Sequence, residues 1–319
     1  MTSTTEDFDT DSEAVMLPEP PERPLDSDCC GNGCVPCVFD IYEEEVALWE
    51  AECKRLRTGG KIYVENKEEP QASPLMPDQY NHYGIESISQ ETCDAVRIRC
   101  TLSPQQKLGL SMGQHIIIRC QKPDGPMITR QYTPISPVDT KGFFELAIKI
   151  YTEGQMSQLV KNWKVGERLE ARGPIGHLSY SRNKFSRILM LCAGTGVAPM
   201  CQVISSVLSD ELEDTYLRLV YACRSYKQLL AKMEIDEWRR FWNFSTIFVL
   251  SQEPDPPSQS YKYGEEVLRG HVDKDLILSE LGNNMCSTFI LVCGTRSFEM
   301  DTLKALKEIG VPNDNVHKF

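Results

Sequence analysis

The octapeptide RQYTPISP, residues 130–137, combines residue types that could together bind one ligand. The planar guanidinium of Arg130 can clamp a phosphate with two parallel hydrogen bonds. The ring of Tyr132 can stack on a flat organic group, and the Thr133 hydroxyl can hydrogen-bond to a ring nitrogen. Prolines hold an extended segment rigid without filling ladder positions. A turn alone would use the prolines and Ser136, but it would not need the arginine and the tyrosine.

A glycine pair follows an apolar stretch in LCAGTGVAPM, residues 191–200. Gly194 and Gly196 would let the backbone approach a ligand closely, and the next helix would offer unpaired N–H groups to a pyrophosphate. A tight turn between a strand and a helix also requires glycines, so the pair alone does not decide between these readings.

The segment LVCGTRSFEM, residues 291–300, repeats this arrangement near the end of the chain. Cys293 and Gly294 would lie at the carboxyl end of a strand, where open α/β sheets bind their ligands. The alternative for Cys293 is a small buried apolar residue, which is the commoner role of a lone cysteine. Ser297 is the predicted N-cap of the final helix.

A third candidate phosphate site is EGQMSQLV, residues 153–160. Backbone amides near Gly154 and the hydroxyl of Ser157 could bind a second phosphate pair at a helix start. The alternative is a helix capped by Ser157 with Met156 in the core.

Four cysteines lie close together near the amino end: Cys29, Cys30, Cys34 and Cys37. Thiolates at this spacing suit a tetrahedral metal or an iron–sulfur cluster, although zinc sites normally use two separated pairs. The alternative is a reduced cysteine-rich turn that packs or binds a partner. Residues 40–56 are predicted to form an amphipathic helix with Tyr42, Val46 and Trp49 on a face that could dock on a protein.

The elements that would position these residues fall into two groups. Apolar runs such as 115–120 and 143–151, punctuated by Gly and Pro, predict a small antiparallel barrel. After about Arg182, buried-type strands at 186–194, 217–223, 245–251 and 288–294 alternate with helical stretches. That alternation predicts a doubly wound parallel sheet, which is an α/β architecture.

Composition and charge exclude several classes of protein. Residues 1–60 hold 15 acidic and 4 basic residues, so they carry −11 of the net charge of −12, and no basic cluster indicates nucleic-acid binding. No apolar run approaches the ~20 residues of a membrane span. The acidic start is unlike a signal or transit peptide, and 13 cysteines without one indicate a reducing compartment. We therefore expect an intracellular protein, cytoplasmic or mitochondrion-associated, that is not secreted.

Four motifs occur in order along the chain: R-x-Y-T-x-x-S at 130–136, G-x-M-S at 154–157, G-T-G-x-x-P-M at 194–200 and C-G at 293–294. They resemble the ferredoxin–NADP reductase superfamily and, within it, the NADH–cytochrome b5 reductase branch. Residues 102–120 and 172–180 are similar to the same branch, and the resemblance covers about 84–319. The leading CCGNGCVPCVFDIYEEE resembles a separate module, an oxidoreductase-like N-terminal domain.

The resemblance implies a six-stranded FAD-binding barrel followed by an NAD-binding domain. Arg130 would meet the FAD pyrophosphate, Tyr132 would pack on the flavin, and Thr133 would sit near its reactive nitrogen. The further residues that would line the FAD site are Gln131, Ser136, Ala147, Lys149, Tyr151, Thr152, Gly154, Gln155, Met156 and Ser157. His115, which would otherwise be read as a core histidine, would lie close to the flavin edge.

The nicotinamide nucleotide would bind the second domain. The residues implied there are Gly194, Thr195, Gly196, Ala198, Pro199, Gln252, Cys293 and Gly294. Phe319 matches the aromatic ending of the family near its active site. Thr133, His115, Lys149 and Cys293 would be the catalytic group, in a hydride transfer followed by single-electron steps that the cofactors themselves carry out.

The sequence departs from the family pattern at several positions. Gln155 replaces a usual lysine, Ala198 a threonine, Gln131 a proline, and Thr295 and Arg296 replace prolines.

The choice between NADH and NADPH would be made near Ser251, Gln252 and Glu253. Glu253 would repel a 2′-phosphate and therefore favours NADH, whereas Arg224 is a nearby cation that argues the other way.

The predicted function is an FAD-dependent NADH reductase that passes electrons to an acceptor resembling cytochrome b5. The alternatives are the same fold serving a different acceptor, or a flavin- or metal-binding interaction protein with little turnover. The predicted boundaries are an acidic tail at 1–28, a cysteine module at 29–65, a linker at 66–81, the barrel at 82–181 and the NAD-binding domain at 182–319.

Overall fold

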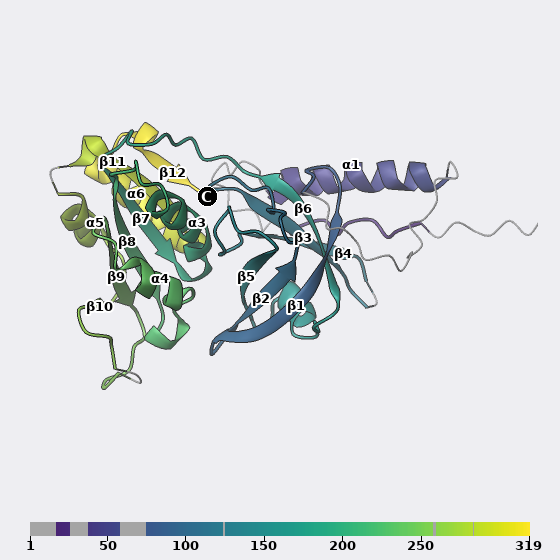
Figure 1. Cartoon of the computed structure of the whole chain (residues 1–319), viewed down its shortest axis with the longest axis horizontal. Helices are drawn as coiled ribbons and strands as arrows, with labels where there is room; N and C mark the ends of the chain where they lie inside the picture. Colours follow the sequence, from purple (N-terminus) through teal and green to yellow (C-terminus); the bar gives the residue numbers. More distant parts are fainter. Residues whose placement is uncertain (1–16, 26–37, 58–74, 124, 258–259, 283) are drawn as a thin grey trace, which may run out of the picture. The chain divides into compact units, whose positions relative to one another are not determined.

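The computed structural model describes residues 17–25, 38–57, 75–123, 125–257, 260–282 and 284–319 (Figure 1). Six strands form an antiparallel domain and six later strands form a parallel domain. The four cysteines at 29–37 lie outside these ranges, so the metal site stays a prediction. Within the described ranges no group of three or more His, Cys, Asp or Glu could hold a metal ion. No helix in this part of the chain is long and apolar enough to cross a membrane.

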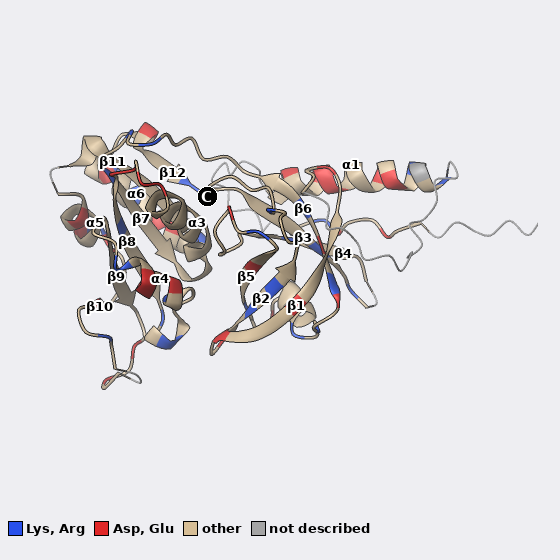
Figure 2. Ribbon diagram, viewed as in Figure 1, with Lys and Arg blue, Asp and Glu red and all other residues tan. Residues whose placement is uncertain are grey.

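The N-terminal helix α1 spans Val38–Arg57 and confirms the predicted helix. Acidic residues follow one another along it (Figure 2), with Asp40 in its first turn and Lys54 and Arg57 near its end, an order that complements the helix dipole. The most buried positions are Ile41, Glu45, Cys53 and Leu56.

The face of α1 that was predicted to dock on a protein lies on the same side of the helix as its most buried positions. Tyr42, Val46 and Trp49 are half-buried and share the side of the helix that carries the buried positions 41, 45, 53 and 56; their role in docking stays a prediction. The Trp49 indole N–H donates a hydrogen bond of 2.7 Å to the Pro18 carbonyl, which takes that ring out of a simple apolar role.

The antiparallel domain has the strand order β4-β3-β6-β1-β2-β5. Its elements are β1 (Asn81–Thr92), β2 (Ala95–Thr101), β3 (His115–Gln121), β4 (Met127–Tyr132), β5 (Phe143–Lys149), α2 (Gln155–Val160) and β6 (Arg168–Ile175). Alternate residues of β5 are buried, as expected for a strand with one face on a core. The core on that face contains Tyr83, Ile98 and Phe144, and Met156 from α2 joins it.

The predicted strand at 143–151 ends at Lys149, two residues early. The Ile150 amide still donates to the Asp94 carbonyl at 2.8 Å, but the chain then turns towards α2. Tyr151 is consequently outside the strand and 52% exposed.

The parallel domain has the strand order β10-β9-β8-β7-β11-β12. Its strands are β7 (Arg187–Ala193), β8 (Tyr216–Cys223), β9 (Phe244–Leu250), β10 (Glu266–Arg269), β11 (Thr288–Cys293) and β12 (Val316–Lys318). Its helices are α3 (Val197–Leu208), α4 (Lys232–Trp238), α5 (Lys274–Leu281) and α6 (Arg296–Ile309), with short 3-10 turns at η2 (Gly194–Gly196), η3 (Tyr226–Gln228), η4 (Met285–Ser287) and η5 (Asn313–Asn315). The doubly wound sheet is confirmed.

Both faces of the parallel sheet are buried, which explains its continuous apolar strands. Ile188, Met190 and Cys192 of β7 belong to the core that contains α3 residues. Leu189 and Leu191 point the other way, into the core that contains residues of α5 and α6. The strand order reverses at β7, which has β8 on one side and β11 on the other. Ligands of such sheets bind at the carboxyl ends of the strands at this reversal.

The predicted N-cap of α6 was wrong by two residues. Thr295, not Ser297, is the N-cap, and its side chain accepts a hydrogen bond from the Phe298 amide. Thr295 has the extended backbone that a cap requires, whereas Ser297 is already inside the helix.

Candidate functional site at the junction of the two domains

The RQYTPISP segment begins as the end of β4. Arg130 is exposed, and its guanidinium donates to the carbonyl of its neighbour Thr129 at 2.7 Å. Within the described residues it has no carboxylate partner. The Tyr132 ring is half-buried, and burial raises the pKa of its hydroxyl well above the ordinary value. The end of β4 thus carries an exposed cation, Arg130, two residues before the half-buried ring of Tyr132.

The remainder of the segment connects β4 with β5 and with the parallel domain. The Ile135 amide donates to the Glu145 carbonyl at 2.8 Å, and the Ser136 hydroxyl accepts from the Glu145 amide at 3.0 Å. The fully buried Gln202 of α3 donates to the Pro134 carbonyl at 3.4 Å. Ser136 therefore holds this segment against β5, and Pro134 contacts the second domain.

The end of β5 leads into the start of α2. The Ser157 hydroxyl accepts from the Tyr151 amide at 3.1 Å, and a Cβ on Gly154 would lie 2.8 Å from the same oxygen. The predicted alternative of a Ser157 cap was wrong, because Gly154 is the N-cap and makes no side-chain cap bond. Gln155 and Thr152 are exposed, and Met156 is buried in the core of the antiparallel domain.

Lys149 meets a carboxylate that the motifs did not reveal. Its ammonium lies 2.9 Å from Asp94, which sits in the turn between β1 and β2. Asp94 also accepts from the Gln228 amide of the parallel domain at 2.7 Å. Burial alone would raise the pKa of Asp94, but the hydrogen bonds from Lys149, Thr92 and Gln228 together lower it. Asp94 is therefore an anion that joins Lys149 to the other domain.

His115, the first residue of β3, is neutral. Burial, and secondarily the charge of Arg172, lower its pKa to about 4. Its Nε2 atom is buried and has no hydrogen-bond partner within the described part of the chain. On the other side of the ring, a Cβ on Gly176 would lie a tight 3.2 Å from Nδ1, and the φ of +92° at Gly176 favours glycine.

The predicted glycine turn connects β7 to α3. Gly194 has φ of +56°, and a Cβ on Gly196 would lie 2.3 Å from the Cys293 carbonyl oxygen. Thr195 is exposed, Ala198 half-buried and Pro199 buried. Gly196 is therefore required by a close packing of this turn on the end of β11.

Cys293 is the last residue of β11, and Gly294 follows it beside that turn. Burial and the neighbouring Glu299 raise the pKa of the Cys293 thiol to about 12, so it stays protonated. The Gly294 amide donates to Glu299 at 3.1 Å. The last residue, Phe319, donates its amide to the Val292 carbonyl at 3.1 Å, and its ring lies 3.3 Å from where a Cβ on Gly113 would be.

The residues expected to read the ribose lie on loops after β8 and β9. The Gln252 amide donates to the Arg224 carbonyl at 2.7 Å, so these loops lie against each other. The Glu253 carboxylate accepts from the Tyr226 amide at 2.7 Å, and its other oxygen is buried. The Glu253 carboxylate, which was expected to repel a 2′-phosphate, thus bonds to the backbone of the loop after β8, while Arg224 and Gln252 are exposed.

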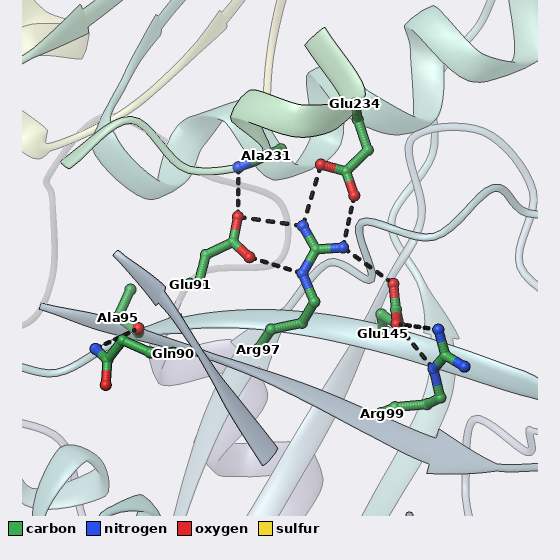
Figure 3. A network of polar contacts seen from close by, with 8 residues as sticks. All are labelled: Gln90, Glu91, Ala95, Arg97, Arg99, Glu145, Ala231 and Glu234. Carbon is green, nitrogen blue, oxygen red and sulfur yellow. Dashed lines mark hydrogen bonds and ion pairs between the residues drawn. The ribbon is translucent and has the colours of Figure 1, made fainter. Parts of the chain in front are cut away.

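An ion cluster joins the two domains next to this region (Figure 3). Arg97 of β2 donates to Glu234 of α4 at 2.6 and 3.1 Å and to Glu91 at 2.7 and 3.2 Å, and it lies 3.2 Å from Glu145. Glu91 also accepts from the Ala231 amide at 2.9 Å. The sequence reasoning missed this cluster because its hydrogen-bonded residues are up to 140 positions apart.

Family models match three parts of the chain. Residues 83–180 match an oxidoreductase FAD-binding domain, residues 190–304 match an oxidoreductase NAD-binding domain, and residues 12–58 match the N-terminal model of oxidoreductase-like proteins. The third match confirms the resemblance seen in the leading cysteine segment.

Two curated relatives match nearly the whole chain, and both are named NADH-cytochrome b5 reductase-like. The Homo sapiens protein is 38% identical over 311 residues, covering 98% of each chain. The Mus musculus protein is 36% identical over 313 residues, covering 97% of this chain and 98% of its own.

Solved structures share the fold. The cytochrome b5 reductase domain of Ulva prolifera nitrate reductase has a TM-score of 0.67 at 25% identity, covering 77% of this chain and 100% of that one. The CS-b5R domains of human Ncb5or in the NAD+ form have a TM-score of 0.65 at 20% identity, covering 76% of this chain and 69% of that one. This chain belongs to the NADH–cytochrome b5 reductase family and is an oxidoreductase with FAD-binding and NAD-binding domains.

Proposed function

We propose that the protein takes a hydride from NADH onto FAD and delivers the electrons singly to a protein acceptor resembling cytochrome b5. The observation that carries the proposal is the position of Asp94, whose carboxylate contacts Lys149 of the FAD-binding domain and Gln228 of the NAD-binding domain. The side chain expected to face flavin and nicotinamide is therefore held where the two domains meet.

The donors of the antiparallel domain fit FAD. Arg130 offers an exposed guanidinium to a pyrophosphate, and the half-buried ring of Tyr132 offers a stacking surface. The buried Nε2 atom of His115 lacks a partner in the described residues, which a bound ligand could supply. Bound FAD would supply the step between two-electron and one-electron chemistry.

Each catalytic candidate would then have a separate task. Lys149 would place a positive charge at the reacting groups, with Asp94 fixing its position. Thr133 would donate a hydrogen bond to the flavin ring. Cys293, whose thiol stays protonated, would border the nicotinamide without adding a negative charge. The neutral His115 would likewise add no charge at the flavin edge.

Further residues would bind without reacting. Gln131, Ala147, Tyr151, Thr152, Gly154, Gln155, Met156 and Ser157 would line the FAD site, with Ser136 holding the segment in place. Gly194, Thr195, Gly196, Ala198, Pro199, Gln252 and Gly294 would bind the nucleotide. NADH is the proposed donor because the two whole-length relatives carry NADH in their names.

The acceptor is proposed from the same names, and a different haem or iron–sulfur protein is the alternative. Because the acidic residues gather before residue 60 and leave a net charge of −1 for 61–319, long-range steering of an acidic partner would be weak. Turnover with cytochrome b5 should accordingly depend little on ionic strength.

The test is steady-state oxidation of NADH with two acceptors, ferricyanide and cytochrome b5. We expect turnover with both, and loss of FAD content in Arg130→Ala but not in Arg168→Ala, which removes another exposed arginine of the same sheet. Turnover with ferricyanide but not with cytochrome b5 would reject the acceptor and keep the reductase. A wild-type protein that binds no FAD would reject the proposal as a whole.

A further inference from the structure

Tyr221 lies in the middle of the parallel domain and holds two segments together through one hydroxyl group. It is a residue of β8 and is fully buried. The hydroxyl donates to the Gly194 carbonyl at 3.1 Å and accepts from the Leu230 amide at 3.0 Å. Both hydrogen-bonding capacities of this buried group are therefore used, one on each segment.

The Gly194 end of this link is the start of the glycine turn. Gly194 has a left-handed backbone, and a Cβ placed there would meet nothing within 4 Å. Among the described residues no side chain packs at this position, and the Gly194 carbonyl accepts one backbone hydrogen bond, from the Val197 amide. Gly196 differs, because it is pressed against Cys293. The Tyr221 hydroxyl adds a side-chain hydrogen bond to the Gly194 carbonyl and ties the turn to β8.

The Leu230 end of the link leads to the antiparallel domain. The next amide, that of Ala231, donates to Glu91 at 2.9 Å, and Glu91 belongs to the Arg97 cluster (Figure 3). Adjacent amides of one turn thus bind the hydroxyl that supports the glycine turn and the carboxylate that anchors the other domain. Ala231 has φ of +53°, so this turn is held in an uncommon conformation by its contacts.

We propose that Tyr221 is a positioning residue, whose hydroxyl keeps the Gly194 turn in the conformation that binds the nucleotide pyrophosphate. Through the Leu230–Ala231 turn, the same hydroxyl also fixes the position of the Gly194 turn relative to the FAD-binding domain. The inference rests on the proposed function. Without the hydroxyl, the Gly194 carbonyl keeps only its backbone bond from Val197 and the Leu230 amide loses its acceptor, so a smaller fraction of molecules holds the binding conformation. The apparent dissociation constant then rises in inverse proportion to the fraction of competent molecules.

The experiment compares Tyr221→Phe with a matched control, Tyr216→Phe. Tyr216 is at the other end of the same strand, and its hydroxyl donates to Ser245 at 2.8 Å. Each variant loses one hydroxyl and keeps its ring, so both should fold with FAD bound. KM and kcat for NADH are measured with ferricyanide as acceptor, together with the dissociation constant of NAD+.

We expect Tyr221→Phe to raise KM for NADH and the dissociation constant of NAD+ about tenfold, the size expected when a buried hydrogen-bonding group loses its partner. KM for ferricyanide should not change, and Tyr216→Phe should stay within twofold of the wild type. Equal constants for Tyr221→Phe and wild type, or equal changes in both variants, would overturn the inference while leaving the reductase intact. A wild-type flavin that no nucleotide reduces would instead overturn the proposed function on which it rests.

Discussion

Replacing Arg97 by alanine is expected to destabilise the protein far more than replacing its neighbour Arg99. The Arg97 side chain is 14% exposed and lies within 3.2 Å of Glu91, Glu145 and Glu234. Without it, Glu91 and Glu234, which are 10% and 23% exposed, would lose their arginine partner, and Glu145, which is 13% exposed, would keep Arg99. Removing one partner of a buried ion pair typically costs about 3–5 kcal/mol, and we expect a loss of that size.

Arg99 provides the control on the same strand. It is 40% exposed and pairs at 2.8 Å with one oxygen of Glu145, a carboxylate that it shares with Arg97. It also lies over the Phe143 ring at 4.2 Å. Exposed pairs contribute about 0–1 kcal/mol, so Arg99→Ala should cost about 1 kcal/mol or less.

The assay is equilibrium unfolding in urea, because guanidinium chloride is a salt and would screen the charges under test. Tryptophan fluorescence and flavin fluorescence are followed together, since the cluster joins the two domains and its loss should separate the two transitions. Equal midpoints for Arg97→Ala and Arg99→Ala would refute the assignment of a buried interdomain cluster.

Three further predictions follow from the site and its supports. Gly196→Ala should abolish nucleotide binding, because its Cβ would lie 2.3 Å from the Cys293 carbonyl oxygen. A Cβ at Gly194 has open space, so Gly194→Ala should cost only about 1 kcal/mol of backbone strain. Titration with NAD+ and thermal unfolding distinguish the two variants. Thr295→Ala should lower stability by about 0.5–1 kcal/mol through loss of the α6 cap while Ser297→Ala changes little, and equal urea midpoints would contradict that cap. The His115 pKa falls from 6.5 to about 4 on folding, so the unfolded state binds more protons between these two pH values. The free energy of unfolding should therefore drop by up to about 3 kcal/mol as the pH falls from 6.5 to 4. Urea unfolding measured at several pH values should show a smaller drop in His115→Asn.

The strands were predictable because their apolar runs report burial directly. The runs at 115–120 and 217–223 lie in β3 and β8 almost as expected, and glycine pairs after apolar runs correctly predicted the turn at 194–196. Boundaries were less predictable. Thr295 and Ser297 are both good caps by residue type, and only the backbone of the folded chain selects between them.

The supporting contacts were not predictable, because they join residues far apart in the sequence. Asp94 and Gln228 are separated by 134 positions, and nothing near either residue indicates the other. Tyr221 was read correctly as part of a buried strand, yet a buried strand does not reveal which backbone groups its hydroxyl will bind. Sequence motifs thus predicted which residues would form the proposed binding surfaces. The contacts that hold those residues in place became visible only in the folded structure.

The most direct test of the proposed function is anaerobic mixing of the FAD-loaded protein with NADH, followed by absorbance at the flavin band, with NADPH as the comparison. We predict rapid bleaching by NADH and slower bleaching by NADPH. A flavin that stays oxidised with both nucleotides would contradict the proposed hydride transfer from NADH to FAD.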